Sequence, residues 1–239
     1  MTGRVGIIVQ ARMGSTRLPG KSLMPLAGEP LVGRILERLK RTNRSDRIIL
    51  AIPNKSSDDP LEALGKKCGV EVFRGSENNL LDRYYQAACE YGLETVIRFP
   101  ADNPVPEPEE IDKIIDYHLN NEFDFCSNLS QVFKNEYPDG IGAEVFNFKK
   151  LEFFWKNERD LEKLEHVHLN FFNYKSQTSE PGIKVSTIPC PKDFSKPEVI
   201  LDVNTPEDYK FMSALYDALY PKNPLFHITD ILNWLDTKR

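Results

Sequence analysis

Short apolar runs alternate with amphipathic segments along the first half of the chain. Four runs are rich in β-branched residues, as in strands buried in a parallel sheet: residues 5–9, 47–52, 70–73 and 95–99. Helical spacing of apolar residues marks residues 31–41, 80–91 and 109–120, and a further helix is expected to start at residues 58–60. This alternation predicts an α/β fold with a mainly parallel sheet and helices on both faces.

The pattern is less regular after residue 122. We expect strands near residues 123–126, 143–146, 183–188 and 199–201, and helices over residues 148–155, 161–174, 206–219 and 228–235. Thr205 is placed to cap the helix that begins at residue 206. We interpret residues 1–239 as a single domain, in which residues 123–200 are an inserted region that builds an acceptor site and a dimer contact.

Composition narrows the class of protein. The chain has 239 residues, of which 40% are hydrophobic, and a net charge of −5, which argues against a nucleic-acid-binding surface. No apolar run is long enough to span a membrane, and no signal peptide is evident. The four cysteines are scattered without a Cys-x-x-Cys pair, which favours reduced thiols. We expect a soluble cytoplasmic protein with neither nucleic-acid nor membrane partners.

The loop after the first apolar run carries three cations, Arg12, Arg17 and Lys21, together with Gly14, Ser15 and Thr16. Free backbone N–H groups, hydroxyls and positive charge at the end of a strand suit a polyphosphate. The loop lacks the order of a P-loop, and no Gly-x-Gly-x-x-Gly is present. A polar turn is the alternative, but three cations so close together would repel one another without an anion.

Two aspartates follow expected strands. Asp102 comes directly after residues 95–99, and Asp202 comes directly after residues 199–201. Because ligands of open parallel sheets bind beyond the carboxyl ends of the strands, both carboxylates are expected in one crevice with the loop. Such a pair provides hard oxygen ligands for Mg²⁺. The alternatives are a turn aspartate before Pro104 and a helix-capping aspartate before residues 205–206.

Four segments resemble, in order, the motifs of the sugar cytidylyltransferases, the enzymes that make CMP-KDO and CMP-sialic acids. They are residues 10–21 (QARMGSTRLPGK), 73–85, 100–104 (PADNP) and 201–208 (LDVNTPED). The spore-coat polysaccharide branch is the most similar. The resemblance implies a Rossmann-like, GT-A-like fold of the nucleotide-diphospho-sugar transferases. It also implies CTP and a sugar-like acceptor as substrates, Mg²⁺ as cofactor and a homodimer.

The resemblance also assigns roles to residues. Arg12, Arg17 and Lys21 are the catalytic candidates, with Lys21 nearest the α-phosphate, and Asp102 and Asp202 are the metal-binding candidates. The candidates for nucleotide binding are Gln10, Ala11, Met13, Gly14, Ser15, Arg74, Ser76, Arg98 and Asp102. Among them the backbone of residues 13–15 is expected to cradle the β- and γ-phosphates. Arg98 departs from the glutamine or threonine-like residue of the KDO enzymes.

For the acceptor, Asp139, Gly140 and Glu144 resemble a Pro-x-Gly-x-x-x-Glu segment of the spore-coat branch, and Glu165 and His166 resemble its Glu-His-Val element. His166 is expected to contact a hydroxyl, phosphate or carboxylate of the acceptor. The acceptor itself cannot be identified from the residues.

Two further hypotheses remain at this point: a nucleotidyltransferase that uses another nucleotide, as guanylyltransferases do, and a non-catalytic nucleotide-binding relative. A glycosyltransferase of this fold would show Asp-x-Asp where the chain has Asp102-Asn103-Pro104. Asp82 and Arg83 have two possible interpretations: an ordinary ion pair within a helix, or a functional pair.

Overall fold

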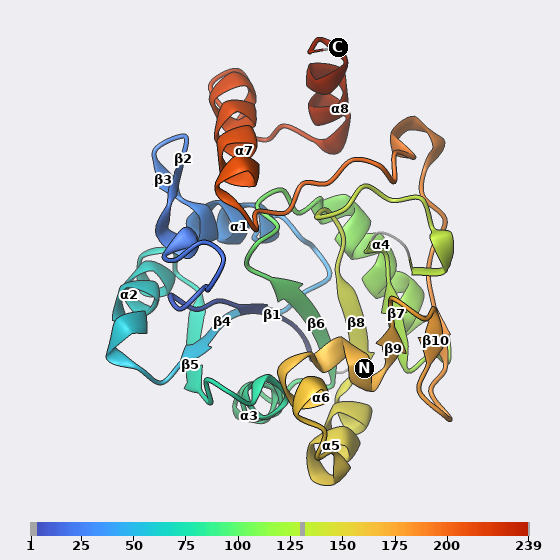
Figure 1. The fold of residues 1–239 in the computed structure, drawn as a ribbon. Coiled ribbons are helices and arrows are strands. Elements are labelled where there is room, and N and C mark those ends of the chain that lie inside the picture. Colours follow the sequence, from blue (N-terminus) through green and yellow to red (C-terminus); the bar gives the residue numbers. More distant parts are fainter. Residues whose placement is uncertain (1–3, 130–131, 239) are drawn as a thin grey trace.

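The computed structural model describes residues 4–129 and 132–238, and a seven-stranded sheet forms its centre (Figure 1). The strand order is β11-β7-β8-β6-β1-β4-β5. The strands are β1 (Val5–Gln10), β4 (Arg47–Pro53), β5 (Glu71–Gly75), β6 (Thr95–Pro100), β7 (Phe125–Ser127), β8 (Glu144–Asn147) and β11 (Val185–Ser186). Only β8 runs antiparallel to its neighbours within this sheet, so the expected mainly parallel α/β fold is confirmed.

Eight α-helices surround the sheet in the described part of the chain: α1 (Leu31–Leu39), α2 (Asp59–Lys67), α3 (Leu80–Glu90), α4 (Pro108–Leu119), α5 (Phe148–Asn157), α6 (Leu161–Glu165), α7 (Pro206–Leu219) and α8 (Ile228–Asp236). Successive residues of β1 face opposite cores, because side chains alternate along a strand. Ile7 packs in the core that includes residues of α1, α2, α4, α7 and α8, and Ile8 packs in the core with residues of α3 and α5. The helices therefore cover both faces of the sheet.

Two short hairpins complete the fold: β2 (Pro25–Leu26) with β3 (Glu29–Pro30), and β9 (Phe172–Asn173) with β10 (Thr178–Ser179). The region 123–200 supplies β7, β8 and β11 to the central sheet. The four cysteines are free. Within the described ranges, no helix combines the length and the apolar character needed to cross a bilayer.

The helix expected over residues 161–174 is wrong beyond Glu165. A 3₁₀ turn (Val167–Asn170) follows α6, and Phe172 then pairs with Ser179. The buried Asn170 side chain donates to the carbonyl oxygens of Lys163 (2.9 Å) and Val167 (3.1 Å). The side chain of Asn170 thus caps carbonyl groups of the turn, and the chain leaves the helical path there.

The strand expected at residues 199–201 is also wrong. This segment makes one isolated bridge, between Ile200 and Asp139, and joins no sheet. The Asp139 N–H donates to the Val199 carbonyl (2.9 Å), and the Leu201 N–H donates to the Asp139 carbonyl (3.1 Å). Ile200 is 60% exposed, so the apolar run is not the buried strand that its composition suggested. The helix that follows, α7, begins as expected, with Thr205 in a capping box with Asp208.

Candidate active site

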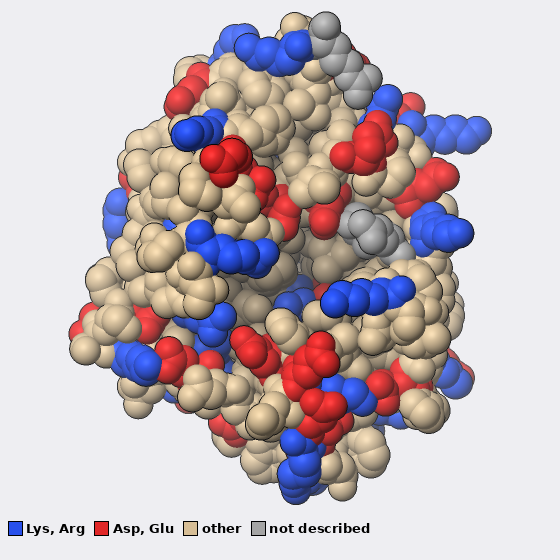
Figure 2. Space-filling view, viewed as in Figure 1, with Lys and Arg blue, Asp and Glu red and all other residues tan. Residues whose placement is uncertain are grey.

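A pocket of about 260 Å³ lies at the carboxyl ends of β1 and β6. Figure 2 shows this face of the molecule hollowed near its centre, with basic and acidic side chains gathered around the hollow. Ten of the residues given a catalytic, nucleotide-binding, metal-binding or acceptor-binding role from the sequence line the pocket: Gln10, Ala11, Arg12, Ser15, Arg17, Lys21, Arg98, Asp102, Glu165 and His166. The first loop, the end of β6 and the end of α6 therefore meet at one site.

Internal hydrogen bonds hold the first loop in place. The Met13 N–H donates to Asp58 Oδ1 (2.8 Å), the Ser15 N–H donates to the Met13 carbonyl (3.0 Å), and Gly20 turns the chain at a φ of 72°. Asp58 stands before α2 as expected, but its side chain makes no hydrogen bond to that helix. Of the three N–H groups expected to cradle phosphates, those of Met13 and Ser15 already have acceptors. The Gly14 N–H has none among the described residues.

The three cations differ in their surroundings. Lys21 Nζ lies 3.4 Å from Asp102 Oδ2 and donates to the Val203 carbonyl (2.7 Å), and its side chain is 12% exposed. Arg12 is exposed and lies 3.8 Å from Glu165, a distance and exposure at which an ion pair contributes little. Arg17 is exposed on the pocket wall. Lys21 is thus fixed, and the two arginines are free to meet a ligand.

Asp102 and Asp202 approach each other although no sheet strand precedes Asp202. The Val203 N–H donates to the Asp102 carbonyl (2.7 Å), which ties the two segments together. Burial first, and then the nearby carboxylates of Asp139 and Asp102, raise the pKa of Asp202 to about 6. The two aspartates and Lys21 therefore form one charged group beside the pocket.

Gly140 makes the approach of Asp139 to this group possible. Its φ is 97°, a conformation that favours glycine, and a Cβ there would lie 3.2 Å from the Leu201 backbone carbon. Residues 139–140 consequently pack directly against residues 201–202. This contact brings two of the acceptor candidates beside Asp202.

The donor set fits Mg²⁺. No group of three or more His, Cys, Asp or Glu side chains in the described part of the chain is arranged to hold a metal ion. Mg²⁺ usually binds through one or two carboxylates and completes its shell with water and substrate phosphates, so a pair such as Asp102 and Asp202 suits it. Burial and, after it, repulsion between the carboxylates raise the pKa of Asp202, and a bound cation would offset both effects.

Arg98 and Glu144 form a buried pair behind the pocket. They are register partners on β6 and β8, and Arg98 Nη1 donates to Glu144 Oε1 (2.6 Å) while its Nε donates to Gln10 Oε1 (3.1 Å). Burial opposes the charge of Arg98, but Glu144 outweighs it and raises the pKa of Arg98. Tyr174 also donates to Glu144 (3.0 Å). Glu144 is fully buried, so the structure puts this acceptor candidate behind Arg98 and away from the open pocket.

Arg74 and Ser76, both expected near the base, do not line the pocket. Arg74 Nη1 is paired with Asp59 (2.8 Å) and Glu62 (2.5 Å) of α2. Ser76 Oγ accepts the Asn79 N–H (3.1 Å) in the turn before α3. The role near the base that the resemblance implied for these two residues is therefore not supported by their positions.

Seven pocket residues were given no role in the site by the sequence: Thr16, Ser22, Glu77, Leu80, Arg83, Pro100 and Ala101. Only their position in the chain could have identified them, because each belongs to a segment that follows a parallel strand or begins the next helix. Arg83 does not pair with Asp82, because Asp82 Oδ1 accepts from Trp155 Nε1 (2.8 Å) and Gln86 Nε2 (3.1 Å). The ordinary helix ion pair is therefore absent.

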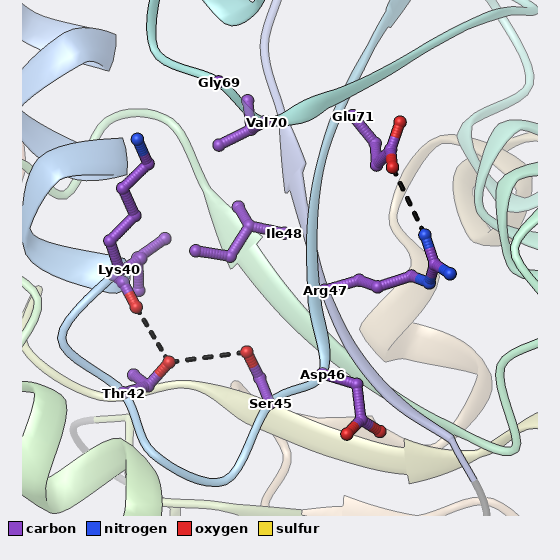
Figure 3. Close-up of a pocket in the computed structure, with 10 residues that line it drawn as sticks. Lys40, Thr42, Ser45, Asp46, Arg47, Ile48, Gly69, Val70 and Glu71 are labelled. Atoms are coloured by element: carbon purple, nitrogen blue, oxygen red, sulfur yellow. Dashed lines mark hydrogen bonds and ion pairs between the residues drawn. The ribbon is translucent and has the colours of Figure 1, made fainter.

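A second hollow lies at the opposite end of β4 and β5, near the start of both strands (Figure 3). Its polar groups already have partners: Arg47 Nη1 pairs with Glu71 Oε1 (3.2 Å), Asp46 Oδ2 accepts the Val5 N–H (2.8 Å), and Thr42 Oγ1 donates to the Leu39 carbonyl (2.7 Å). Ligands of parallel sheets bind at the carboxyl ends, so we assign the active site to the first pocket.

Comparison with known proteins agrees with this geometry. The sequence model of the family described as cytidylyltransferase matches residues 6–233, and the chain belongs to this family. It is 34% identical over 215 residues to the spore coat polysaccharide biosynthesis protein SpsF of Bacillus subtilis, covering 87% of this chain and 85% of that protein. It is 35% identical over 232 residues to an uncharacterized protein of Methanocaldococcus jannaschii, covering 96% of this chain and 89% of that protein.

Among solved structures, a cytidylyltransferase from Leptospira borgpetersenii matches with a TM-score of 0.88 and 28% identity, covering 99% of this chain and 95% of that one. The agreement extends over the whole chain and includes the strands contributed by residues 123–200. The protein is therefore a cytidylyltransferase with the Rossmann-like fold of nucleotidyltransferases.

Proposed function

We propose that the protein transfers CMP from CTP to a sugar, sugar acid or small phosphorylated acceptor in surface polysaccharide synthesis, with Mg²⁺ bound at Asp102 and Asp202. Membership of the cytidylyltransferase family and the name of its SpsF relative support the reaction and its setting. The single observation that carries the site assignment is the position of Lys21, 3.4 Å from Asp102 in a pocket that Arg12 and Arg17 also line.

The proposed reaction is an in-line displacement. An acceptor oxygen attacks the α-phosphorus of CTP, its P–O bond forms as the bond to the bridging oxygen breaks, and pyrophosphate leaves. Arg12, Arg17 and Lys21 stabilise the negative charge that grows on the phosphoryl oxygens and the leaving group. When bound, Mg²⁺ neutralises charge on the triphosphate.

The acceptor is proposed to enter between two groups of residues. Glu165 and His166 line the pocket beside the first loop, and Asp139 and Gly140 lie beside Asp202. Both groups offer hydrogen-bonding side chains or backbone to a polyhydroxylated molecule. We further propose that the protein works in the cytoplasm, where CTP is available, as a homodimer with residues 123–200 in the contact; size-exclusion chromatography with light scattering tests the dimer.

A pyrophosphate-release assay tests the reaction. The protein is incubated with CTP, Mg²⁺ and a panel of KDO-like acids, neutral sugars and sugar phosphates, with GTP and UTP as parallel nucleotides. We expect pyrophosphate and a cytidylylated product with CTP, and loss of both when Mg²⁺ is chelated. No turnover with any acceptor, together with no CTP binding by calorimetry, would reject the proposed function.

A further inference from the structure

Four arginines in the described part of the chain are buried: Arg34, Arg38, Arg83 and Arg98. Three of them each donate at least two hydrogen bonds: Arg34 to Leu26, Ala27 and Glu37, Arg38 to Pro106 and Phe226, and Arg98 to Gln10 and Glu144. Arg83 is 4% exposed, and its Nε and Nη1 have no hydrogen-bond partner. An unpaired buried guanidinium is costly, and such a group calls for a compensating ligand.

Arg83 belongs to the wall of the active-site pocket. It is the fourth residue of α3, and it lines the pocket together with Glu77 and Leu80. Its stem passes close over Gly75, where an added Cβ would lie 3.1 Å from Arg83 Cγ. Burial first, with a smaller contribution from nearby Arg12, lowers the pKa of Arg83 to about 10. These surroundings indicate that the Arg83 guanidinium binds an electron-rich group of a ligand that enters the pocket.

We propose that Arg83 recognises the base of the bound nucleotide by donating hydrogen bonds to O2 and N3 of cytosine. The inference rests on the proposed function, because it takes CTP as the occupant of this pocket. It makes Arg83 a specificity-determining residue, in the place that the sequence motif gave to Arg74.

The charges around Arg83 favour the base over a phosphate. Asp58 and Glu77 are near enough to act on the guanidinium electrostatically, and they would repel a phosphate placed beside it. Arg12, Arg17 and Lys21 on the first loop already supply positive charge for the triphosphate. Cytosine O2 and N3 are uncharged acceptors, and the apolar side chain of Leu80 on the same wall suits the face of a base.

This contact would distinguish cytosine from uracil. Position N3 is an acceptor in cytosine but carries a hydrogen in uracil, so a guanidinium that donates to N3 of cytosine meets a donor in uracil. A site built around such a hydrogen bond rejects the analogue strongly, because its own buried polar group is then left unpaired.

Calorimetric titration of wild type and Arg83→Met with CTP, UTP and inorganic tripolyphosphate tests the inference. In the variant we expect CTP to bind about 10- to 100-fold more weakly, the preference for CTP over UTP to fall towards one, and the affinity for tripolyphosphate to stay unchanged. The metal-free, ligand-free variant should also melt at a higher temperature than wild type, since an uncompensated buried charge has been removed.

Arg34→Met is the matched control. Arg34 is also 4% exposed, but its N–H groups donate to the Leu26 carbonyl (2.9 Å), the Ala27 carbonyl (2.6 Å) and Glu37 (2.7 Å), outside the pocket. Its removal should lower the melting temperature and leave the affinity for CTP unchanged. Arg83→Gln provides a second variant at the site itself: its amide offers both a donor and an acceptor, so the preference for CTP over UTP should again decline.

Three outcomes would overturn the inference. Equal weakening of CTP and tripolyphosphate in both Arg83 variants would make Arg83 a phosphate-binding residue. Unchanged CTP affinity and unchanged base preference would make it structural, while the proposed function would stand. Failure of wild type to bind CTP, with tripolyphosphate or another nucleotide bound instead, would overturn the inference and the proposed function together.

Discussion

Replacement of Asp202 by asparagine should stabilise the metal-free protein at neutral pH. Burial and the carboxylates of Asp139 and Asp102 raise the pKa of Asp202 from 3.8 to about 6, so its ionised form is disfavoured in the folded state. A shift of about two units corresponds to at most about 3 kcal/mol. Because the side chain is only half-buried, solvent screening reduces this to on the order of 1 kcal/mol.

The size of this stabilisation depends on pH, while its sign stays the same. Between pH 3.8 and about 6 the folded protein binds a proton at Asp202 that the unfolded chain does not, so wild-type stability rises as pH falls through this window. Asp202→Asn lacks this titration. Its advantage over wild type should therefore be greatest above pH 7 and vanish below about pH 4.

Thermal unfolding in the presence of a chelator measures this difference. We expect Asp202→Asn to melt about 2–4 °C above wild type at pH 7.5, and to lose the stabilisation that Mg²⁺ with CTP gives wild type. Asp208→Asn is the control with the opposite sign. Although burial opposes it, the N–H groups of Asn204 (2.9 Å) and Thr205 (2.7 Å) lower the pKa of Asp208, so its replacement should destabilise. A lower melting temperature for Asp202→Asn at pH 7.5 would refute the clustering of like charges.

Three further predictions concern residues around the pocket. Lys21→Ala should lower kcat by about 100-fold or more in the pyrophosphate assay while CTP still binds, because a fixed cation that stabilises developing charge is lost; an unchanged kcat would contradict this. Gly140→Ala should destabilise the fold by about 1–3 kcal/mol in urea unfolding and weaken Mg²⁺ binding, because it places a left-handed alanine against the Leu201 backbone; no change in either quantity would exclude this role. Glu144→Gln should lower stability by about 3–5 kcal/mol because Arg98 remains buried without its counter-charge, and a variant as stable as wild type would show that the pair is dispensable.

The strands and helices of the first half were predictable because each carries its own pattern of apolar residues. The errors lie where a distant partner decides the conformation. The apolar spacing of residues 161–174 fits a helix, but the side chain of Asn170 bonds to carbonyls of the turn. Residues 199–201 have the composition of a strand, yet they pair only with the loop at Asp139.

The same distinction holds for the site. The first loop and Asp102 were predictable because they directly follow parallel strands, whereas Asp202 reaches the group for another reason, the hydrogen bond from the Val203 N–H to the Asp102 carbonyl (2.7 Å). The position of Arg83 in the site could not be predicted because Asp82, its neighbour in sequence, suggested an ion pair. Asp82 instead bonds to Trp155, which lies 73 residues away. Arg74 belongs to the segment that resembles the family motif, but its side chain pairs with Asp59 and Glu62 of α2. Neighbours in sequence are thus poor guides to partners of charged side chains.

The reversed direction of β8 determines which of its flanking segments borders the pocket. The other strands of the sheet bring their last residues to this edge, but β8 brings its first, so Glu144 stands opposite Arg98. The segment that precedes β8, with Asp139 and Gly140, consequently lies beside Asp202, while the segment that follows it leads away into α5. If residues 139–140 bind the acceptor as proposed, an insertion before Glu144 should alter the choice of acceptor in the pyrophosphate assay, and one of equal length after Asn147 should leave it unchanged.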